Sequence, residues 1–249
     1  GQEWPFFTLP FFAAEAELLI DQTKTHPYFA LHPLVRESQR EQWEEYSVEN
    51  QGWVQDAYAF KGLHGNASNI CPFVSQGEET CVQEDRAANP YFAPIWQIAP
   101  FPGPNEQLIN YNGFDWKYFE RSFEVMSQAN HVVLSEVVNL GEDATRWPES
   151  LLSTPVHQDI HDDSPIVAVL TAIMPWHDYF LNVLPVGSDG IVVVVNNDFQ
   201  SFTYEINGPE VHYLGPGDLH DPKYDHLEIV NDFAAFENSK GDFGYTVHV

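Results

Sequence analysis

The chain has 249 residues, of which 43% are hydrophobic and 14% aromatic, so it is long enough and apolar enough to bury a sizeable core. It carries 37 Asp and Glu against 10 Lys and Arg, which gives a formal net charge of −27. A surface of this charge repels phosphate backbones and anionic lipid headgroups, which argues against nucleic-acid binding. A well-solvated acidic surface explains the charge, and cations or cationic ligands are compatible with it.

The first quarter of the chain is predicted to be mostly helical. An extended aromatic segment over residues 1–12 is expected to lie on the body of the protein, and a short helix follows over residues 13–22. A longer helix is predicted over most of residues 33–60, because apolar side chains recur there at helical spacing while glutamates occupy the other side. The sequence Asn-Gln-Gly at residues 50–52 is the expected place for a break in this helix.

A polar loop over residues 62–89 contains both cysteines of the chain and a glycosylation sequon. Cys71 and Cys81 close a short loop, which suggests a disulfide, and Asn66 opens the sequence Asn-Ala-Ser. Side by side, the two features favour an extracellular or lumenal location. The alternative is a reduced cysteine pair and an unused sequon.

Short strands and turns dominate from residue 91 onward. A helix is expected from an N-cap at Asp115 to about residue 130, and another begins at Pro175. The apolar, β-branched or alternating runs that predict strands are residues 91–99, 108–112, 132–140, 151–157, 166–174, 190–195, 201–206, 211–214 and 243–249.

This order predicts an α+β protein in which helices cover one face of an antiparallel sheet and a ligand pocket forms between them. The expected parts are residues 1–89, with the helix and the cysteine loop, residues 90–215, a sensor module, and residues 216–249, a membrane-proximal part with strands. The chain contains no run of about 20 apolar residues, the length that a membrane span needs. Because it begins at Gly1 and stops in a strand-like run, we expect it to be a piece of a longer protein.

A succession of short patterns resembles the CHASE domain, a ligand-sensing ectodomain of membrane histidine kinases and nucleotide cyclases. These patterns are Ala93-Pro94-Ile95-Trp96, Asn110-Tyr111-Asn112, the helix Glu120-Arg121-Ser122-Phe123-Glu124, Leu134-Ser135-Glu136, LLSTPV at residues 151–156 and VAVL at residues 167–170. With WPFFTLPFF near the start and LPVGSDGIVVVVNN late in the chain, this version looks most like those of receptor-type guanylate cyclases of marine microalgae.

The resemblance implies a long stalk helix, a PAS-like module that binds the ligand and a second, smaller module near the C-terminus. It also implies a parent receptor that is a homodimer on the extracellular side of the plasma membrane, held by flanking spans. The cyclase domain would lie outside this chain, so the chain itself is expected to have no catalytic activity and no cofactor. The family includes the plant cytokinin receptors, in which an acidic side chain recognises an adenine-type ligand. Asp115 falls near the position of that side chain. The flanking sequence departs too far for cytokinin specificity to be carried over.

The expected ligand site combines aromatic and amide groups before the helix with two strands across the sheet. Its residues are Trp96, Gln97, Asn110, Tyr111, Asn112, Asp115, Pro155, Leu170, Thr171 and Ala172. The alternative is that these side chains only pack the core and cap turns.

Two other functions stay open. His157 and Asp159 have the spacing of two ligands in a 2-His-1-carboxylate iron site, with His212 or His220 as a third ligand. A 2-oxoglutarate enzyme of that class needs an Arg after the metal ligands to bind the carboxylate of the cofactor. The last Arg of this chain is Arg146, which precedes them. The third function is a secreted interaction module with no small ligand. Asp218 begins a further cluster of acidic and His residues, but this cluster lacks the ligand pattern of a calcium or zinc site, so no metal is expected.

Overall fold

The computed structural model describes residues 4–23, 28–50, 71–72, 90–100, 108–138, 147–159, 164–195, 200–219, 222, 229–230 and 247–248. These residues form a mixed α+β fold with four α-helices. Contacts within the chain divide it into two compact units, and each is described by itself below. Unit 1 comprises Gly1–Ser135 with Leu151–Ile173, and unit 2 comprises Glu136–Ser150 with Met174–Val249. This division differs from the expected boundaries after residues 89 and 215.

The helical prediction for the start of the chain is partly right. The short helix is confirmed as α1 (Phe12–Thr23). The longer helix, α2, spans only Arg40–Glu49 among the described residues, and it ends where a break was expected. Its predicted start at residue 33 is wrong, because β1 (Phe29–Pro33) and β2 (Val35–Arg36) occupy that stretch. Residues 51–60 lie outside the described part of the chain.

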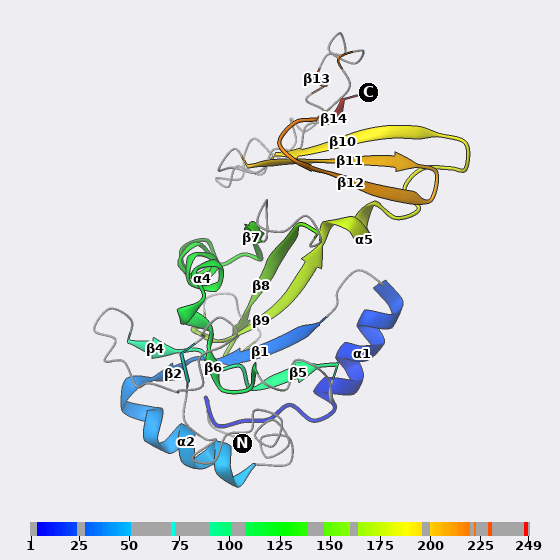
Figure 1. Cartoon of the computed structure of the whole chain (residues 1–249). Coiled ribbons are helices and arrows are strands. Elements are labelled where there is room, and N and C mark those ends of the chain that lie inside the picture. Colours follow the sequence, from blue (N-terminus) through cyan, green and yellow to red (C-terminus); the bar gives the residue numbers. More distant parts are fainter. Residues whose placement is uncertain are drawn as a thin grey trace. The chain divides into compact units, whose positions relative to one another are not determined.

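The central element of unit 1 is a five-stranded sheet in the order β5-β1-β9-β8-β7. Its other strands are β5 (Gln97–Ala99), β7 (Val133–Val138), β8 (Glu149–His157) and β9 (Ile166–Pro175), and the ends of β7, β8 and β9 extend into unit 2. Strand β1 pairs antiparallel with both β5 and β9, as Figure 1 shows. The sheet is therefore not confined to residues 90–215, the expected sensor module, since a strand from the first 35 residues lies in its middle.

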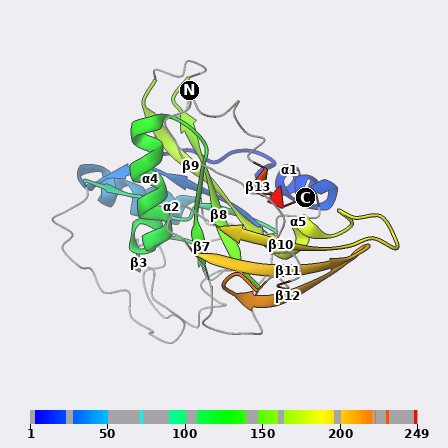
Figure 2. The same cartoon turned by 90° about the horizontal axis from the view of Figure 1, so that it is seen from above.

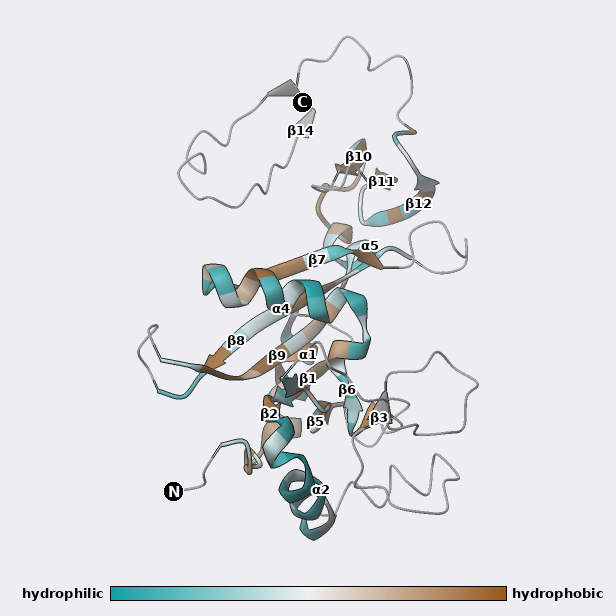
Figure 3. Cartoon of the chain, turned by 90° about the vertical axis from the view of Figure 1, so that its left-hand side faces the viewer, coloured by the Kyte–Doolittle hydropathy of each residue, from teal (hydrophilic) through white to brown (hydrophobic). Residues whose placement is uncertain are grey.

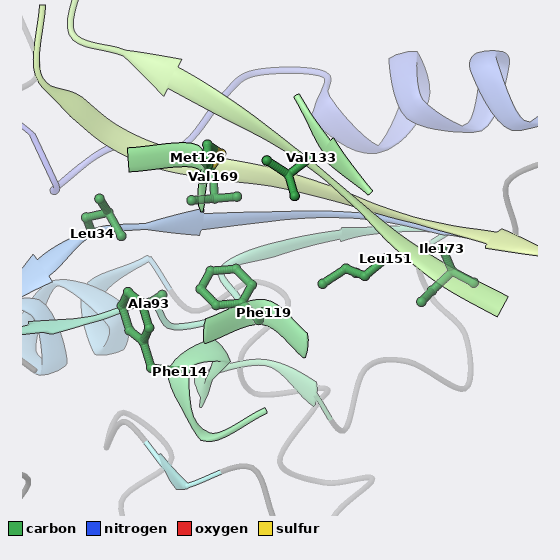
Figure 4. Packing of buried hydrophobic residues seen from close by; sticks show 9 residues of the cluster. All are labelled: Leu34, Ala93, Phe114, Phe119, Met126, Val133, Leu151, Val169 and Ile173. Atoms are coloured by element: carbon green, nitrogen blue, oxygen red, sulfur yellow. The ribbon is translucent and has the colours of Figure 1, made fainter. Parts of the chain in front are cut away.

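One face of this sheet is covered by α4 (Lys117–Ala129). Side chains of α4 pack with Leu151 of β8 and with Val169 and Ile173 of β9 in a buried apolar cluster (Figure 4). The cluster comprises Leu34, Ala93, Phe114, Phe119, Met126, Val133, Leu151, Val169 and Ile173. Asp115 lies in a 3-10 turn, η3 (Gly113–Asp115), and Trp116 rather than Asp115 is the N-cap of α4. The helix ends at Asn130, whose left-handed conformation (φ 55°) terminates it.

A second cluster holds α2 against unit 1. Trp43 of α2 is fully buried and packs edge-to-face on Trp96, with 5.0 Å between the ring centroids. Most of the other side chains of α2 are polar, and Figure 3 shows the helix mostly in teal. The two-residue strands β4 (Tyr91–Phe92) and β6 (Tyr111–Asn112) pair with β2 and with β3 (Cys71–Pro72), respectively. The strand predicted over residues 91–99 is thus divided into β4 and β5 around Pro94, its expected interruption.

The opposite face of the sheet carries the N-terminal aromatic segment. Phe7 is buried against Leu31 and Ala168, and Phe12 at the start of α1 packs against the same cluster. The prediction that this segment lies on the body of the protein is confirmed for the described residues 4–12. Both faces of the sheet are therefore covered, one by α4 and the other by this segment.

Unit 2 is built on an antiparallel sheet in the order β10-β11-β12 (Figure 2). Its strands are β10 (Asp189–Val195), β11 (Ser201–Asn207) and β12 (Glu210–Pro216), which confirms the predicted hairpin ladder. The helix predicted after Pro175 is the short α5 (Trp176–Phe180). The indole N–H of Trp176 donates to the Ser150 hydroxyl at 3.0 Å, which fixes α5 to the start of β8. Near the C-terminus, β13 (Ile229–Val230) pairs with β14 (Val247–His248).

None of the described helices has both the length and the apolar character that crossing a membrane requires.

Candidate functional site

Two of the predicted site residues hold the N-terminal segment in place. The indole N–H of Trp96 donates to the carbonyl oxygen of Phe7 at 3.0 Å and lies 3.2 Å from the Thr8 hydroxyl. The side-chain amide of Gln97 accepts from the backbone N–H of Leu9 at 2.8 Å and donates to its carbonyl at 3.0 Å. The polar groups of Trp96 and Gln97 are therefore engaged by the protein itself.

The predicted residues before α4 are engaged in the same way. The amide nitrogen of Asn110 donates to the Ser47 hydroxyl at 2.7 Å, and the amide oxygen of Asn112 accepts from the backbone N–H of Ala93 at 2.9 Å. Tyr111 accepts the backbone N–H of Ile95 through its carbonyl oxygen, at 2.9 Å, and burial raises the pKa of its phenol. These contacts fix the chain that leads into η3, where Asp115 lies half-buried.

The predicted residues on β9 point to opposite faces of the sheet, because side chains alternate along a strand. Leu170 is paired with Leu31, on the face that the N-terminal segment covers, and Ala172 lies on that same face. Thr171 lies on the α4 face together with Val169 and Ile173. Of these three predicted residues, only Thr171 reaches the face where a ligand was expected.

Thr171 contacts a buried histidine that was not predicted as a site residue. The Nε2 atom of His32, on β1, lies 2.9 Å from the Thr171 hydroxyl, and its Nδ1 atom lies 3.3 Å from the carbonyl oxygen of Ala93. A carbonyl only accepts, so Nδ1 carries the proton and Nε2 accepts from Thr171. Burial lowers the pKa of His32 from 6.5 to about 4, with a smaller opposing effect of the Ala93 carbonyl. The imidazole is therefore neutral at pH 7.

A third polar side chain lies on the same face, on the next strand. Ser153 of β8 is two residues from Leu151, which packs under α4 with Ile173, and Ser153 therefore faces the same side as Thr171. It is 1% exposed, and its hydroxyl has no hydrogen-bond partner among the described residues. A buried hydroxyl without a partner costs about 1–3 kcal/mol, so such groups call for an explanation. Pro155, another predicted site residue, is two positions further along this face.

His32, Thr171 and Ser153 form what we call the polar row, with one residue on each of the neighbouring strands β1, β9 and β8. All three side chains are at most 4% exposed and lie on an otherwise apolar face. The row offers neutral hydrogen-bond donors and acceptors and no charge. It therefore suits recognition of an uncharged polar group rather than nucleophilic or metal chemistry.

The residues proposed for an iron site make other contacts. Nδ1 of His157 donates to the carbonyl oxygen of Ser164 at 2.8 Å, and Asp159 is exposed. The described residues contain no group of three His, Cys, Asp or Glu side chains placed to hold a metal ion. His212 lies in the other unit beside Glu210, and His220 lies outside the described residues. Asn66 and Cys81 also lie outside them, so the predicted glycan and disulfide stay predictions.

Comparison with protein-family models and with the curated proteins found no match to this sequence.

Proposed function

We propose that this chain is a CHASE-like ligand-sensing domain from the extracellular side of a membrane receptor, and that unit 1 is its PAS-like sensor module. If the five strands are numbered 1 to 5 along the chain, their order across the sheet is 2-1-5-4-3. Helix α4 lies between strands 2 and 3 in the sequence. We interpret this five-stranded sheet with a helix across one face as the PAS-like element. Unit 2, with its smaller sheet, is the proposed membrane-proximal module.

The observation that carries this proposal is the polar row beneath α4. An apolar core without a ligand gains nothing from a buried hydroxyl that has no partner. A ligand that accepts from Ser153 would satisfy that group and use the apolar side chains around it for affinity. Since His32 is neutral and the row has no charged side chain, we propose a small uncharged polar ligand.

Signalling would follow from a shift between two conformations with different affinities for the ligand. The ligand binds at the sheet face that α4 covers, and a displacement of α4 is the proposed response. The output domain would be a nucleotide cyclase in the parent receptor, which we expect to act as a homodimer. We propose no catalytic step for this chain.

A thermal-shift screen of small uncharged polar compounds against the purified chain tests the proposal. A true ligand stabilises the folded state by an amount that grows with its concentration. Ser153→Ala should fold as well as the natural chain, since the hydroxyl has no partner to lose, and should lose most of the ligand-dependent shift. Thr154→Ala, one residue away on the opposite face, is the matched control and should keep it. Equal shifts in both variants would place the ligand elsewhere.

A further inference from the structure

A second group of buried polar atoms without partners lies in unit 2. Tyr204, in the middle of β11, is fully buried, and its hydroxyl has no hydrogen-bond partner among the described residues. The same holds for Nδ1 of His177 in α5. The two rings lie close together, with 6.1 Å between their centroids. Two such atoms in one place call for a ligand more strongly than either atom alone.

Aromatic rings surround these atoms. Phe180 and Tyr213 each lie 5.2 Å from the ring of Tyr204, measured between centroids. The indole of Trp147 stacks on His177 at 3.8 Å with an interplanar angle of 12°, yet Trp147 is 48% exposed. The group therefore extends from the buried Tyr204 to an indole that solvent reaches.

Among the described residues of unit 2, carboxylates are the charged groups around these rings, and His212 lies near His177. The described residues of unit 2 contain no Lys and no Arg. The pKa of Tyr204 is raised mainly by burial. Tyr213 and the carboxylates of Asp178 and Glu149 raise this pKa further, which means that they lie near the Tyr204 hydroxyl. Burial also raises the pKa of Asp178, while the neighbouring His177 opposes this effect. Burial lowers the pKa of His177, and the nearby His212 adds to this while Asp178 opposes it, so the imidazole is neutral at pH 7. The described residues of unit 2 therefore supply no Lys or Arg to pair with Asp178.

We propose that Trp147, His177, Asp178, Tyr204 and Tyr213 form a binding site for the ammonium group of a small organic amine. An alkylammonium ion has three N–H donors, and the site offers three acceptors: the Tyr204 hydroxyl, Nδ1 of the neutral His177 and the Asp178 carboxylate. The faces of the aromatic rings attract the same cation. An anionic or neutral ligand would leave the carboxylate without a counter-charge. This inference concerns unit 2 alone and does not rest on the ligand proposed for unit 1.

The test uses the full chain and butylammonium chloride as the probe, with the Trp147 indole N–H resonance as the readout. The resonance is assigned by its loss in Trp147→Phe. We expect a saturable shift with butylammonium and none with n-butanol or potassium chloride. Asp178→Asn should weaken binding about tenfold, because it removes one charge-assisted contact. Asp189→Asn, which removes the same charge elsewhere in unit 2, is the control and should leave the affinity within about twofold, the scale of screened distant charges.

Tyr204→Phe separates binding from folding. The hydroxyl has no partner to lose, so the variant should melt at the natural temperature or above it while binding the amine several-fold more weakly. A shift that does not saturate, an equal shift with n-butanol, or equal weakening by Asp178→Asn and Asp189→Asn would overturn the proposal. A clear loss of thermal stability in Tyr204→Phe would also overturn it, because the hydroxyl would then have a partner within the protein.

Discussion

His32 is a buried titratable residue whose two ring nitrogens contact Ala93 and Thr171. Its pKa falls from 6.5 in the unfolded chain to about 4 in the folded one. Above pH 6.5 both states are neutral, and the contribution of His32 to stability is fully present. As the pH falls below 6.5 the unfolded state takes up a proton first, so stability decreases until about pH 4, where the folded imidazole is protonated as well.

We therefore predict that His32 accounts for a loss of up to about 3 kcal/mol in the free energy of unfolding between pH 7 and pH 4. Urea unfolding at both values measures it, and His32→Gln should lose less stability over that range by about this amount. An unchanged pH dependence in His32→Gln would contradict the buried neutral imidazole.

Gly113 is a sensitive position beside the same histidine. A Cβ atom added there would meet Cδ1 of Phe119 at 3.1 Å and Nδ1 of His32 at 3.2 Å. Both rings are buried and have little room to move, so we predict that Gly113→Ala lowers the free energy of unfolding by about 1–3 kcal/mol. Gly187→Ala is a poor control because its φ is +88°. Gln128→Ala, at an exposed position of α4, is a better one. A Gly113→Ala variant as stable as the natural chain would show that this packing is looser than described.

The N-terminal segment is the element that depends most on a few side chains. Gln97 makes two hydrogen bonds to the backbone of Leu9, and Trp96 makes one to Phe7. We predict that Gln97→Ala frees residues 4–12 from the sheet, with local protection against hydrogen exchange reduced by about tenfold or more, the effect of losing two bonds of about 1 kcal/mol each. Hydrogen exchange with mass spectrometry measures this directly. Gln158→Ala is the control, and equal exchange in the two variants would refute the role of Gln97.

Elements with a local signal were predictable from the sequence. The hairpins of β10, β11 and β12 follow from apolar runs between turn residues, and α4 follows from its apolar stripe. Strand β1 was missed because its partners, β5 and β9, lie far along the chain, and because its Pro33 was interpreted as the start of a helix. The pattern of apolar and polar residues in a five-residue segment does not show whether that segment will be a central strand of a sheet.

The candidate site shows the same limit. Thr171 was predicted as part of the strand segment Leu170-Thr171-Ala172 that was expected across the sheet from the aromatic and amide groups. His32 and Ser153 carry no comparable signal, since a sequence does not show which residues on different strands share a face. Trp96, Gln97 and Asn110 have the chemistry expected of a ligand site, but in the fold they bind backbone and side-chain groups of the protein itself.

At the scale of the whole molecule, the proposed extracellular location makes a prediction outside the described residues. Produced through a eukaryotic secretory pathway, the chain should carry a glycan on Asn66 and a disulfide between Cys71 and Cys81. Mass spectrometry before and after glycosidase and reductant measures both, with Asn66→Gln as the control for glycan attachment. A free thiol at both cysteines together with an unmodified Asn66 would argue against this location.

The two units give the molecule two proposed sites with different chemistry, an uncharged one in unit 1 and an ammonium site in unit 2. Because the first depends on Ser153 and the second on Asp178, a variant of either residue leaves the other site intact. Thermal shifts with an uncharged ligand and with butylammonium should then add, since the two proposed sites share no residue.

The most direct measurement is a crystal structure of the chain with a compound from the uncharged-ligand screen. The account predicts that the compound lies between α4 and the sheet, with an acceptor atom within hydrogen-bonding distance of the Ser153 hydroxyl and with contacts to Thr171. A bound compound located elsewhere, with the face beneath α4 still filled by its own side chains, would contradict the account.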